Sequence, residues 1–105
     1  MQLAQPTDFE ILAALSDGRR NTAANLSHII DKKRTYINTR LPLLADYGLV
    51  ERVGPAPNSG LYQITTCGEI ALDLRDVYEM DEQSFESRLE ERLKGVPPET
   101  APEEA

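Results

Sequence analysis

Residues 37–65, INTRLPLLADYGLVERVGPAPNSGLYQIT, decide the fold of this chain. Three apolar residues have the i, i+4, i+7 spacing of an amphipathic helix, and Gly48 stands where a glycine commonly follows a helix: Ile37, Leu41 and Leu44. Two short β-type runs come next, joined by the turn formers GPAPNSG: LVERV at 49–53 and LYQIT at 61–65. The stretch therefore predicts a helix followed directly by a β-hairpin.

Two further helices are expected before this stretch. Thr7 and Glu10 have the spacing of a capping box, which predicts that a first helix begins at Thr7. Asn21 or Thr22 can cap a second helix that ends near Asp31. The buried faces are expected to hold Ile11, Leu12 and Leu15 in the first helix, with Phe9 flanking them, and Ala23, Leu26, Ile29 and Ile30 in the second.

Two more helices are expected after the hairpin. Thr66 and Glu69 form another capping box, which predicts a fourth helix. Met80 and Phe85 flank Asp81 as a hydrophobic staple flanks an N-cap, which predicts a last helix over 81–94. The apolar stripes are Ile70, Leu74, Val77 and Tyr78 in the fourth helix, and Phe85, Leu89 and Leu93 in the last.

Three helices, a hairpin and another helix are the order of a winged helix-turn-helix, a mainly α fold with a small β-hairpin (α+β). We expect a DNA-binding domain over residues 1–80 and a C-terminal helix over 81–94 for packing or dimerisation. Residues 95–105 are acidic, rich in proline and almost without large apolar groups, so we expect a disordered tail.

The charge is distributed unevenly along the chain. A net charge of −7 disfavours binding to DNA, which is a polyanion. Residues 1–66 nevertheless sum to +1, whereas residues 67–105 sum to −8. The segment from Arg19 to Arg40 holds six bases and one acid. The acidity therefore belongs to the C-terminal third, and the helix-turn-helix segment is cationic.

The outward face of the third helix carries the candidate DNA-binding residues, because a winged helix inserts this helix into the major groove. Amide and guanidinium groups can pair with base edges, threonine methyls can contact thymine, and lysines neutralise phosphates. The candidates in this helix, in the turn before it and at the base of the hairpin are Lys32, Lys33, Arg34, Thr35, Tyr36, Asn38, Thr39, Arg40 and Arg52.

Some of these residues have a second interpretation. The cations can simply form a solvated helix face, although the order of elements favours DNA contact. Tyr36 can equally pack against the second helix. Arg19 and Arg20 lie in the loop before the second helix, where phosphate contact and a plain polar loop are both open.

Residues 7–75 resemble a known group of regulators. The runs LPLLADYGLVERVG and NSGLYQIT, with the Thr-x-x-Gly helix start at Thr65 to Gly68, are similar to winged-helix regulators of haloarchaea, including the group named after a haloarchaeal phage repressor. They resemble the MarR and ArsR types more distantly. The resemblance implies a dimeric transcriptional repressor with residues 32–40 as its recognition segment. Few lysines relative to arginines and an acidic surface agree with a high-salt cytoplasm.

The sequence departs from the pattern of that group in two places. Pro42 stands where such helices usually carry a polar residue. The wing tip, residues 55–60, contains no arginine or lysine that could enter a minor groove. Contact between the wing and DNA is therefore left open.

The sequence predicts no enzyme, metal site, cofactor or small-molecule ligand. Cys67 and His28 are too few for a Cys/His zinc site, and no glycine-rich phosphate loop is present. Cys67 can be a redox sensor activated by a helix N-terminus or, as we favour, a packing residue. With no long apolar run and no secretory signal, we expect a cytoplasmic protein.

Two classes of function follow. The first is a sequence-specific repressor that binds double-stranded DNA as a homodimer, with the third helix of each subunit in the major groove. The second is a protein-interaction module that keeps the winged-helix scaffold without binding DNA, which the overall acidity favours. A ligand-gated or redox-gated regulator is a third possibility that the sequence does not support with a recognisable pocket.

Overall fold

The computed structural model describes residues 1–54 and 60–96, which form six helices and one two-stranded antiparallel sheet. In chain order the elements are α1 (Thr7–Ala14), α2 (Ala23–Ile30), α3 (Arg34–Asp46), β1 (Val50–Val53), β2 (Leu61–Ile64), α4 (Thr66–Asp73), α5 (Arg75–Met80) and α6 (Glu82–Lys94). The predicted mainly helical fold with a small hairpin is confirmed. The expected wing tip, except Gly60, and most of the expected tail lie outside the described residues.

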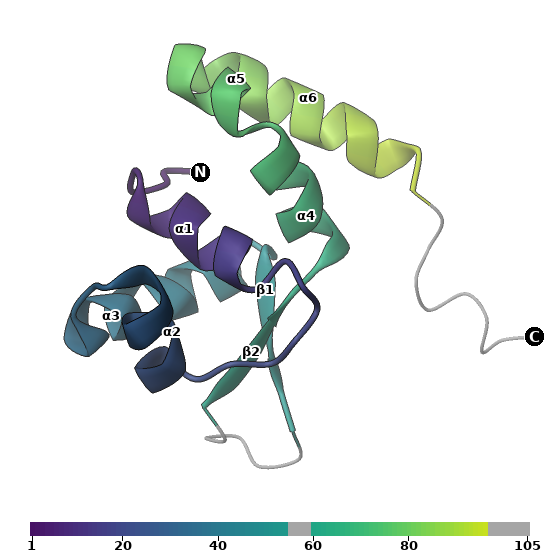
Figure 1. The fold of residues 1–105 in the computed structure, drawn as a ribbon. Coiled ribbons are helices and arrows are strands. Elements are labelled where there is room, and N and C mark those ends of the chain that lie inside the picture. Colours follow the sequence, from purple (N-terminus) through teal and green to yellow (C-terminus); the bar gives the residue numbers. More distant parts are fainter. Residues whose placement is uncertain (55–59, 97–105) are drawn as a thin grey trace, which may run out of the picture.

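The elements form two ends joined by α1 and α4. Figure 1 shows α2, α3 and the hairpin at one end, and α5 with α6 at the other. The segment before α1 contacts both: the Gln2 amide donates to the Tyr47 hydroxyl just after α3, at 3.1 Å, and the Leu3 amide donates to the Tyr78 hydroxyl in α5, at 2.9 Å. The first residues therefore link the end that holds α3 to the end that holds α6.

One apolar core runs through both ends. Most of the side chains of α1, α3 and α6 that were predicted to face inward are buried, among them Ile37, Leu41, Leu44 and Phe85; Phe9 is buried too, and Leu93 is only partly buried. Phe9, Tyr78 and Phe85 pack edge to face, with ring centroids 5.0–6.3 Å apart. Such aromatic pairs add about 0.5–1.5 kcal/mol each beyond the burial of their area. The C-terminal helix α6 is thus packed into the core of the helix-turn-helix part.

The hairpin is fixed to the start of α2. Val50 pairs with Ile64 and Val53 with Leu61 in the antiparallel register. On the other edge of β2, Asn21 and Tyr62 exchange two backbone hydrogen bonds of 2.9 Å. These bonds satisfy part of an edge that would otherwise present unpaired backbone groups. The position of the wing is therefore coupled to the position of the helix-turn-helix.

The start of α4 packs on the turn between α3 and β1. Thr65, not Thr66, is the N-cap: its hydroxyl accepts from the Gly68 amide at 3.0 Å and donates to the Gly48 carbonyl at 2.6 Å. The predicted capping box is therefore wrong by one residue. A Cβ at Gly68 would lie 2.1 Å from the Leu49 carbonyl oxygen, so only glycine allows this close approach.

Three other predictions about helix ends and faces are wrong. Helix α1 has Pro6 as its N-cap with no side-chain cap, and Thr7 is buried instead of capping. Ile29 is 56% exposed, because α2 buries a narrower face than its apolar pattern predicts. Met80 is 86% exposed, so no hydrophobic staple forms, although Asp81 does cap α6 by accepting from the Gln83 amide.

An ion pair between Asp8 and Arg40 joins α1 to α3. Asp8 is completely buried, and Arg40 donates to both of its carboxylate oxygens, from Nε at 3.0 Å and from an Nη atom at 2.8 Å. The Ala4 amide donates to the same carboxylate at 2.7 Å. Hydrogen bonding to Asp8 raises the pKa of Arg40. Both oxygens of the buried carboxylate are therefore satisfied, and α3 is held against α1 by a bidentate contact.

Replacing Asp8 with asparagine should destabilise the fold by about 3 kcal/mol, because the Arg40 guanidinium would lose its countercharge in a largely buried place. The measurement is urea unfolding followed by circular dichroism. Asp46→Asn on the exposed side of α3 is the matched control and should change the free energy of unfolding by less than about 0.5 kcal/mol. Equal stability of the two variants would show that the ion pair does not hold α3 in place.

Candidate nucleic-acid interface

A tight turn orients α3 relative to α2. Asp31 adopts the left-handed conformation, with φ 57°, at the end of α2, and Lys33 is the N-cap of α3. Aspartate tolerates this conformation better than most residues. The Ser27 hydroxyl donates to the Lys32 carbonyl at 2.6 Å and so closes the turn. The short predicted connection between the two helices is confirmed, and its geometry is locally fixed.

The side of α3 opposite its buried residues is open to solvent. Ile37, Leu41 and Leu44 have no exposed surface. The exposed candidate residues at the start of α3 and on its outward side are Lys33, Arg34, Thr35, Tyr36, Asn38 and Thr39. Tyr36 is 42% exposed, so part of its ring is open to solvent. The polar and cationic surface predicted for this helix is therefore present.

The cations around α3 differ in how they are paired. Within residues 1–54 and 60–96, Arg20, Lys33 and Arg34 make no salt bridge, and all three are exposed. Lys32 lies 3.6 Å from a Glu10 carboxylate oxygen, and Arg19 lies 3.7 Å from Asp17. A cation without an internal partner can meet a phosphate without first breaking a contact. Among the cations around α3, those without a salt bridge in the described chain therefore lie at the start of α3 and before α2.

Arg40 does not belong with these exposed cations. Its side chain is only 17% exposed, and both nitrogens described above are directed to Asp8. The helical pattern placed it at the margin of the outward face, but a buried acid on another helix captures it. Nothing in the local sequence announced this pairing, because Asp8 and Arg40 are distant in the chain.

Arg52 is exposed on β1 but is positioned by the hairpin. Its Nε donates to the Tyr62 hydroxyl at 2.9 Å, and its guanidinium lies 5.7 Å from the centroid of the same ring. Tyr62 in turn pairs with Asn21 just before α2. The contact fixes the arginine on β1 beside Tyr62, near the helix-turn-helix.

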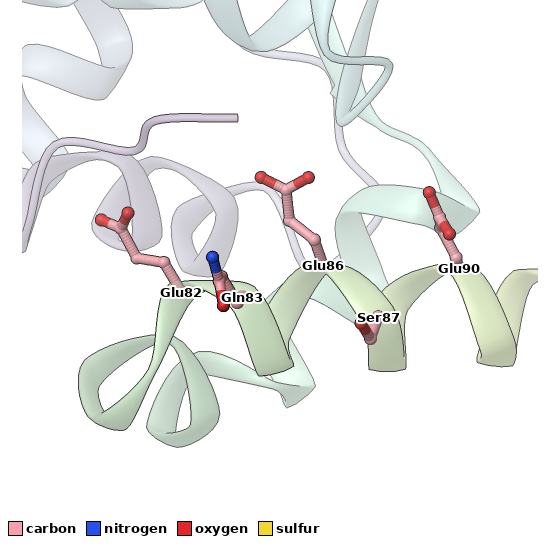
Figure 2. Close-up of a pocket in the computed structure, with 5 residues that line it drawn as sticks. All are labelled: Glu82, Gln83, Glu86, Ser87 and Glu90. Carbon is pink, nitrogen blue, oxygen red and sulfur yellow. The ribbon is translucent and has the colours of Figure 1, made fainter.

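The end of the molecule that holds α6 has the opposite electrostatic character. Figure 2 shows Glu82, Glu86 and Glu90, four residues apart, on one side of α6, where with Gln83 and Ser87 they line a shallow hollow. Glu82 accepts from the Tyr78 hydroxyl at 2.9 Å, and Glu86 forms an ion pair with the amino group of Met1. A surface of this charge repels nucleic acid. The candidate interface is thus confined to the end that holds α3.

Cys67 packs against the core at the start of α4 and is half-buried. Burial raises the pKa of its thiol, which is the reverse of the activation that a redox sensor needs. The redox alternative is therefore not supported, and the packing role that we favoured agrees with its position.

Two other features bear on the class of protein. No helix among the described residues is long and apolar enough to cross a lipid bilayer. In the same part of the chain, no three acidic, histidine or cysteine side chains are grouped so that they could hold a metal ion. His28 is exposed.

No protein-family model matches this chain, and no curated protein sequence does either. Solved structures of similar shape do exist. A cysteine-to-serine mutant of MarR from E. coli has a TM-score of 0.58 and 21% identity, over 90% of this chain and 67% of that one. The same mutant complexed with operator DNA has a TM-score of 0.53 and 23% identity, over 90% of this chain and 76% of that one.

A Zalpha domain from Cyprinid herpesvirus 3, ORF112, which binds Z-DNA, has a TM-score of 0.52 and 17% identity, over 61% of this chain and the whole of that domain. The chain has a winged-helix fold. Within this winged helix, α2 and α3 are the helix-turn-helix and β1 and β2 are the strands of the wing. In the match to the oxidised form of MarR from E. coli, this chain covers 61% of the length of the MarR chain.

The raised pKa of the Cys67 thiol predicts slow modification of the folded protein. At pH 8 a smaller fraction of Cys67 should be ionised in the native protein than in the urea-unfolded chain, whose thiol has a pKa of about 8.5. DTNB should therefore react more slowly with the native protein. The contribution of the buried neutral thiol to stability should be complete below the unfolded pKa and lost as the pH rises through the folded pKa. Equal DTNB rates for native and unfolded protein would contradict the burial of this thiol.

Proposed function

We propose that this protein is a non-enzymatic transcriptional regulator that binds double-stranded DNA, with α3 in the major groove. The observation that carries the proposal is the exposed side of α3, where polar side chains lie next to Lys33 and Arg34, two cations that make no salt bridge with any described residue. The major groove of B-DNA is wide enough to admit a helix, and groups of this kind contact phosphates and base edges.

The contacts around α3 divide by chemistry. Lys33, Arg34 and Arg20 supply charge for phosphates, and Arg52 at the base of the hairpin can reach the backbone on the other side of the groove. Asn38 and the two threonines Thr35 and Thr39 are left for the bases. Lys32 would exchange its weak contact with Glu10 for a phosphate. We leave Arg40 out of the interface, because its guanidinium is bound to Asp8.

The acidity of the chain does not prevent this function. The negative charge lies in residues 67–105, which include α5 and α6, and Figure 1 shows α6 at the end of the molecule away from α3. Salt at physiological concentration screens exposed charges beyond roughly 8–10 Å. A duplex on α3 therefore meets the local cationic surface and not the net charge of the chain.

Two neighbours of the same fold support the proposal through what they bind: one is complexed with operator DNA, and one binds Z-DNA. The resemblance to haloarchaeal regulators favours a repressor that acts in the cytoplasm. Transcription in vitro from a promoter that overlaps the bound sequence tests whether the protein represses or activates. A repressor should lower the transcript level when it is added.

A protein-interaction module remains the second candidate, and the acidic side of α6 is the observation that favours it. A salt series separates DNA binding from binding through an apolar protein interface. Counterion release makes the logarithm of the DNA association constant fall with the logarithm of salt, by about 0.9 per phosphate contact. An apolar protein interface strengthens slightly in salts such as sulfate.

Removing the cations at the start of α3 should weaken DNA binding selectively. We expect Lys33→Ala and Arg34→Ala each to lower the affinity for duplexes selected from genomic fragments and to reduce the salt slope by about one, because each removes one phosphate contact. The measurement is fluorescence anisotropy across a salt series.

The matched control is Arg88→Ala, which removes an exposed arginine from α6 without touching α3. This variant should bind like the parent when light scattering gives it the same mass as the parent, because the proposed dimer also uses the end that holds α6. Left-handed and right-handed duplexes should both be tested, because one neighbour binds Z-DNA. If the two α3 variants bind as tightly as Arg88→Ala, α3 is not the DNA-contacting helix.

We also propose that the protein binds as a homodimer through the end that holds α5 and α6, which keeps both copies of α3 free for half-sites about 34–36 Å apart. Light scattering should give the mass of two chains, and the dimer should strengthen with salt as repulsion between the acidic surfaces is screened. A monomeric mass at micromolar concentration, both free and on DNA, would rule out the dimer.

A further inference from the structure

The part of α3 that would face the bases carries polar side chains but no free cation at its centre, within the described chain. Arg40, the cation closest to the middle of this helix, is bound to Asp8. Lys33 and Arg34 precede the buried Ile37 by four and three residues, so they flank the core-facing side of the helix. Their charges are suited to the phosphates along the groove. No free arginine or lysine is left at the centre of the outward side, within the described part of the chain.

The centre of the outward side is occupied by two threonines. Thr35 and Thr39 are both exposed and four residues apart, so they lie on one face, opposite Ile37. The Thr39 hydroxyl donates to the Tyr36 carbonyl at 2.6 Å. Its proton is therefore used inside the helix, and its methyl is the group that remains for an apolar contact. Pro42, three residues further along, is also without a side-chain donor.

These groups match one class of base pair. Thymine is the base that presents a methyl group in the major groove, and asparagine can pair bidentately with N6 and N7 of adenine. The commonest specific contact to guanine needs an arginine or lysine on O6 and N7. The exposed Asn38 supplies the amide, the two threonines supply the methyls, and the cation that guanine would need is absent from the centre of this side.

We propose that α3 recognises A·T base pairs through thymine methyl groups, with Thr35 and Thr39 as the specificity-determining residues and Asn38 as the adenine contact. This inference rests on the proposed DNA-binding function and adds the class of sequence that is bound. The phosphate contacts of Lys33 and Arg34 supply affinity without regard to sequence. The two threonines and Asn38 supply the discrimination.

Replacement of thymine by deoxyuridine tests the inference directly, because it removes only the methyl group. A duplex is first selected by the protein from a random pool, and single thymines are then replaced by deoxyuridine. Each contacted position should weaken binding about three- to fourfold, which is the effect of losing one buried methyl. Replacements outside the protected segment should leave the dissociation constant unchanged.

Variants assign the effect to the protein. Thr35→Ser and Thr39→Ser keep a hydroxyl and remove the methyl, so each should abolish the thymine-to-uracil difference at one position. Lys33→Ala is the control. It should lower the affinity for the thymine duplex and for the uracil duplex by the same factor, so that the ratio of the two dissociation constants is unchanged. Circular dichroism confirms that the exposed serine variants are folded.

The outcomes separate the inference from the function on which it rests. Tight salt-dependent binding with equal affinity for thymine and uracil duplexes, or selection of sites whose invariant pairs are G·C, overturns the A·T assignment and leaves DNA binding intact. Absence of binding to every duplex, with the parent protein folded, overturns the proposed function itself and the inference with it.

Discussion

The buried carboxylate of Asp8 constrains much of this structure. A charge without exposed surface must be paired and hydrogen-bonded, because leaving it unpaired would cost several kcal/mol. Arg40 from α3 and the Ala4 amide satisfy it. The pairing sets α3 against α1 and at the same time removes one arginine from the outward surface. The interface available to a partner is therefore what remains of α3 after the fold has used the groups it needs.

A second constraint couples the wing to the helix-turn-helix. The two backbone bonds between Asn21 and Tyr62 join a residue two positions before α2 to β2, and Tyr62 also positions Arg52. A rigid relation between α3 and the hairpin matters for a groove-binding protein, because contacts on both sides of a groove hold only if their spacing is fixed. The same tyrosine thus serves both the fold and the placement of a cation.

Much of the fold could be predicted from spacing alone. The i, i+4, i+7 residues of α3 are completely buried, and the two β-type runs pair as a hairpin, because these periodicities follow directly from helix and strand geometry. Cap positions were less predictable. Thr65 and Thr66 are chemically identical, but the Thr65 hydroxyl reaches the Gly48 carbonyl, and the close approach of Gly68 to the Leu49 carbonyl sets α4 in this position. That approach is a tertiary contact, invisible in the local sequence.

The candidate site, too, could be predicted where it follows from the local helical pattern, and not where it depends on tertiary contacts. Exposure of Thr35, Tyr36 and Thr39 followed from the helical pattern, because they lie on the side opposite Ile37, and Lys33 and Arg34 are exposed at the start of the helix. The fate of Arg40 did not, since its partner is 32 residues away on another helix. The burial predicted for Ile29 and Met80 was wrong. An apolar residue is buried only where another element covers it, and none does so at these two positions within the described chain.

The separation of charge limits how a second copy could be placed. The carboxylates of Glu82, Glu86 and Glu90 share one side of α6, so a two-fold contact across that side would bring like charges together. Like charges without countercharges oppose association unless salt screens them. The exposed Met80 at the end of α5 and the partly buried Leu93 near the end of α6 offer apolar surface near this row. A dimer built on these residues, with the acidic row at its rim, would satisfy both the hydrophobic and the electrostatic requirement and would leave each α3 facing outward.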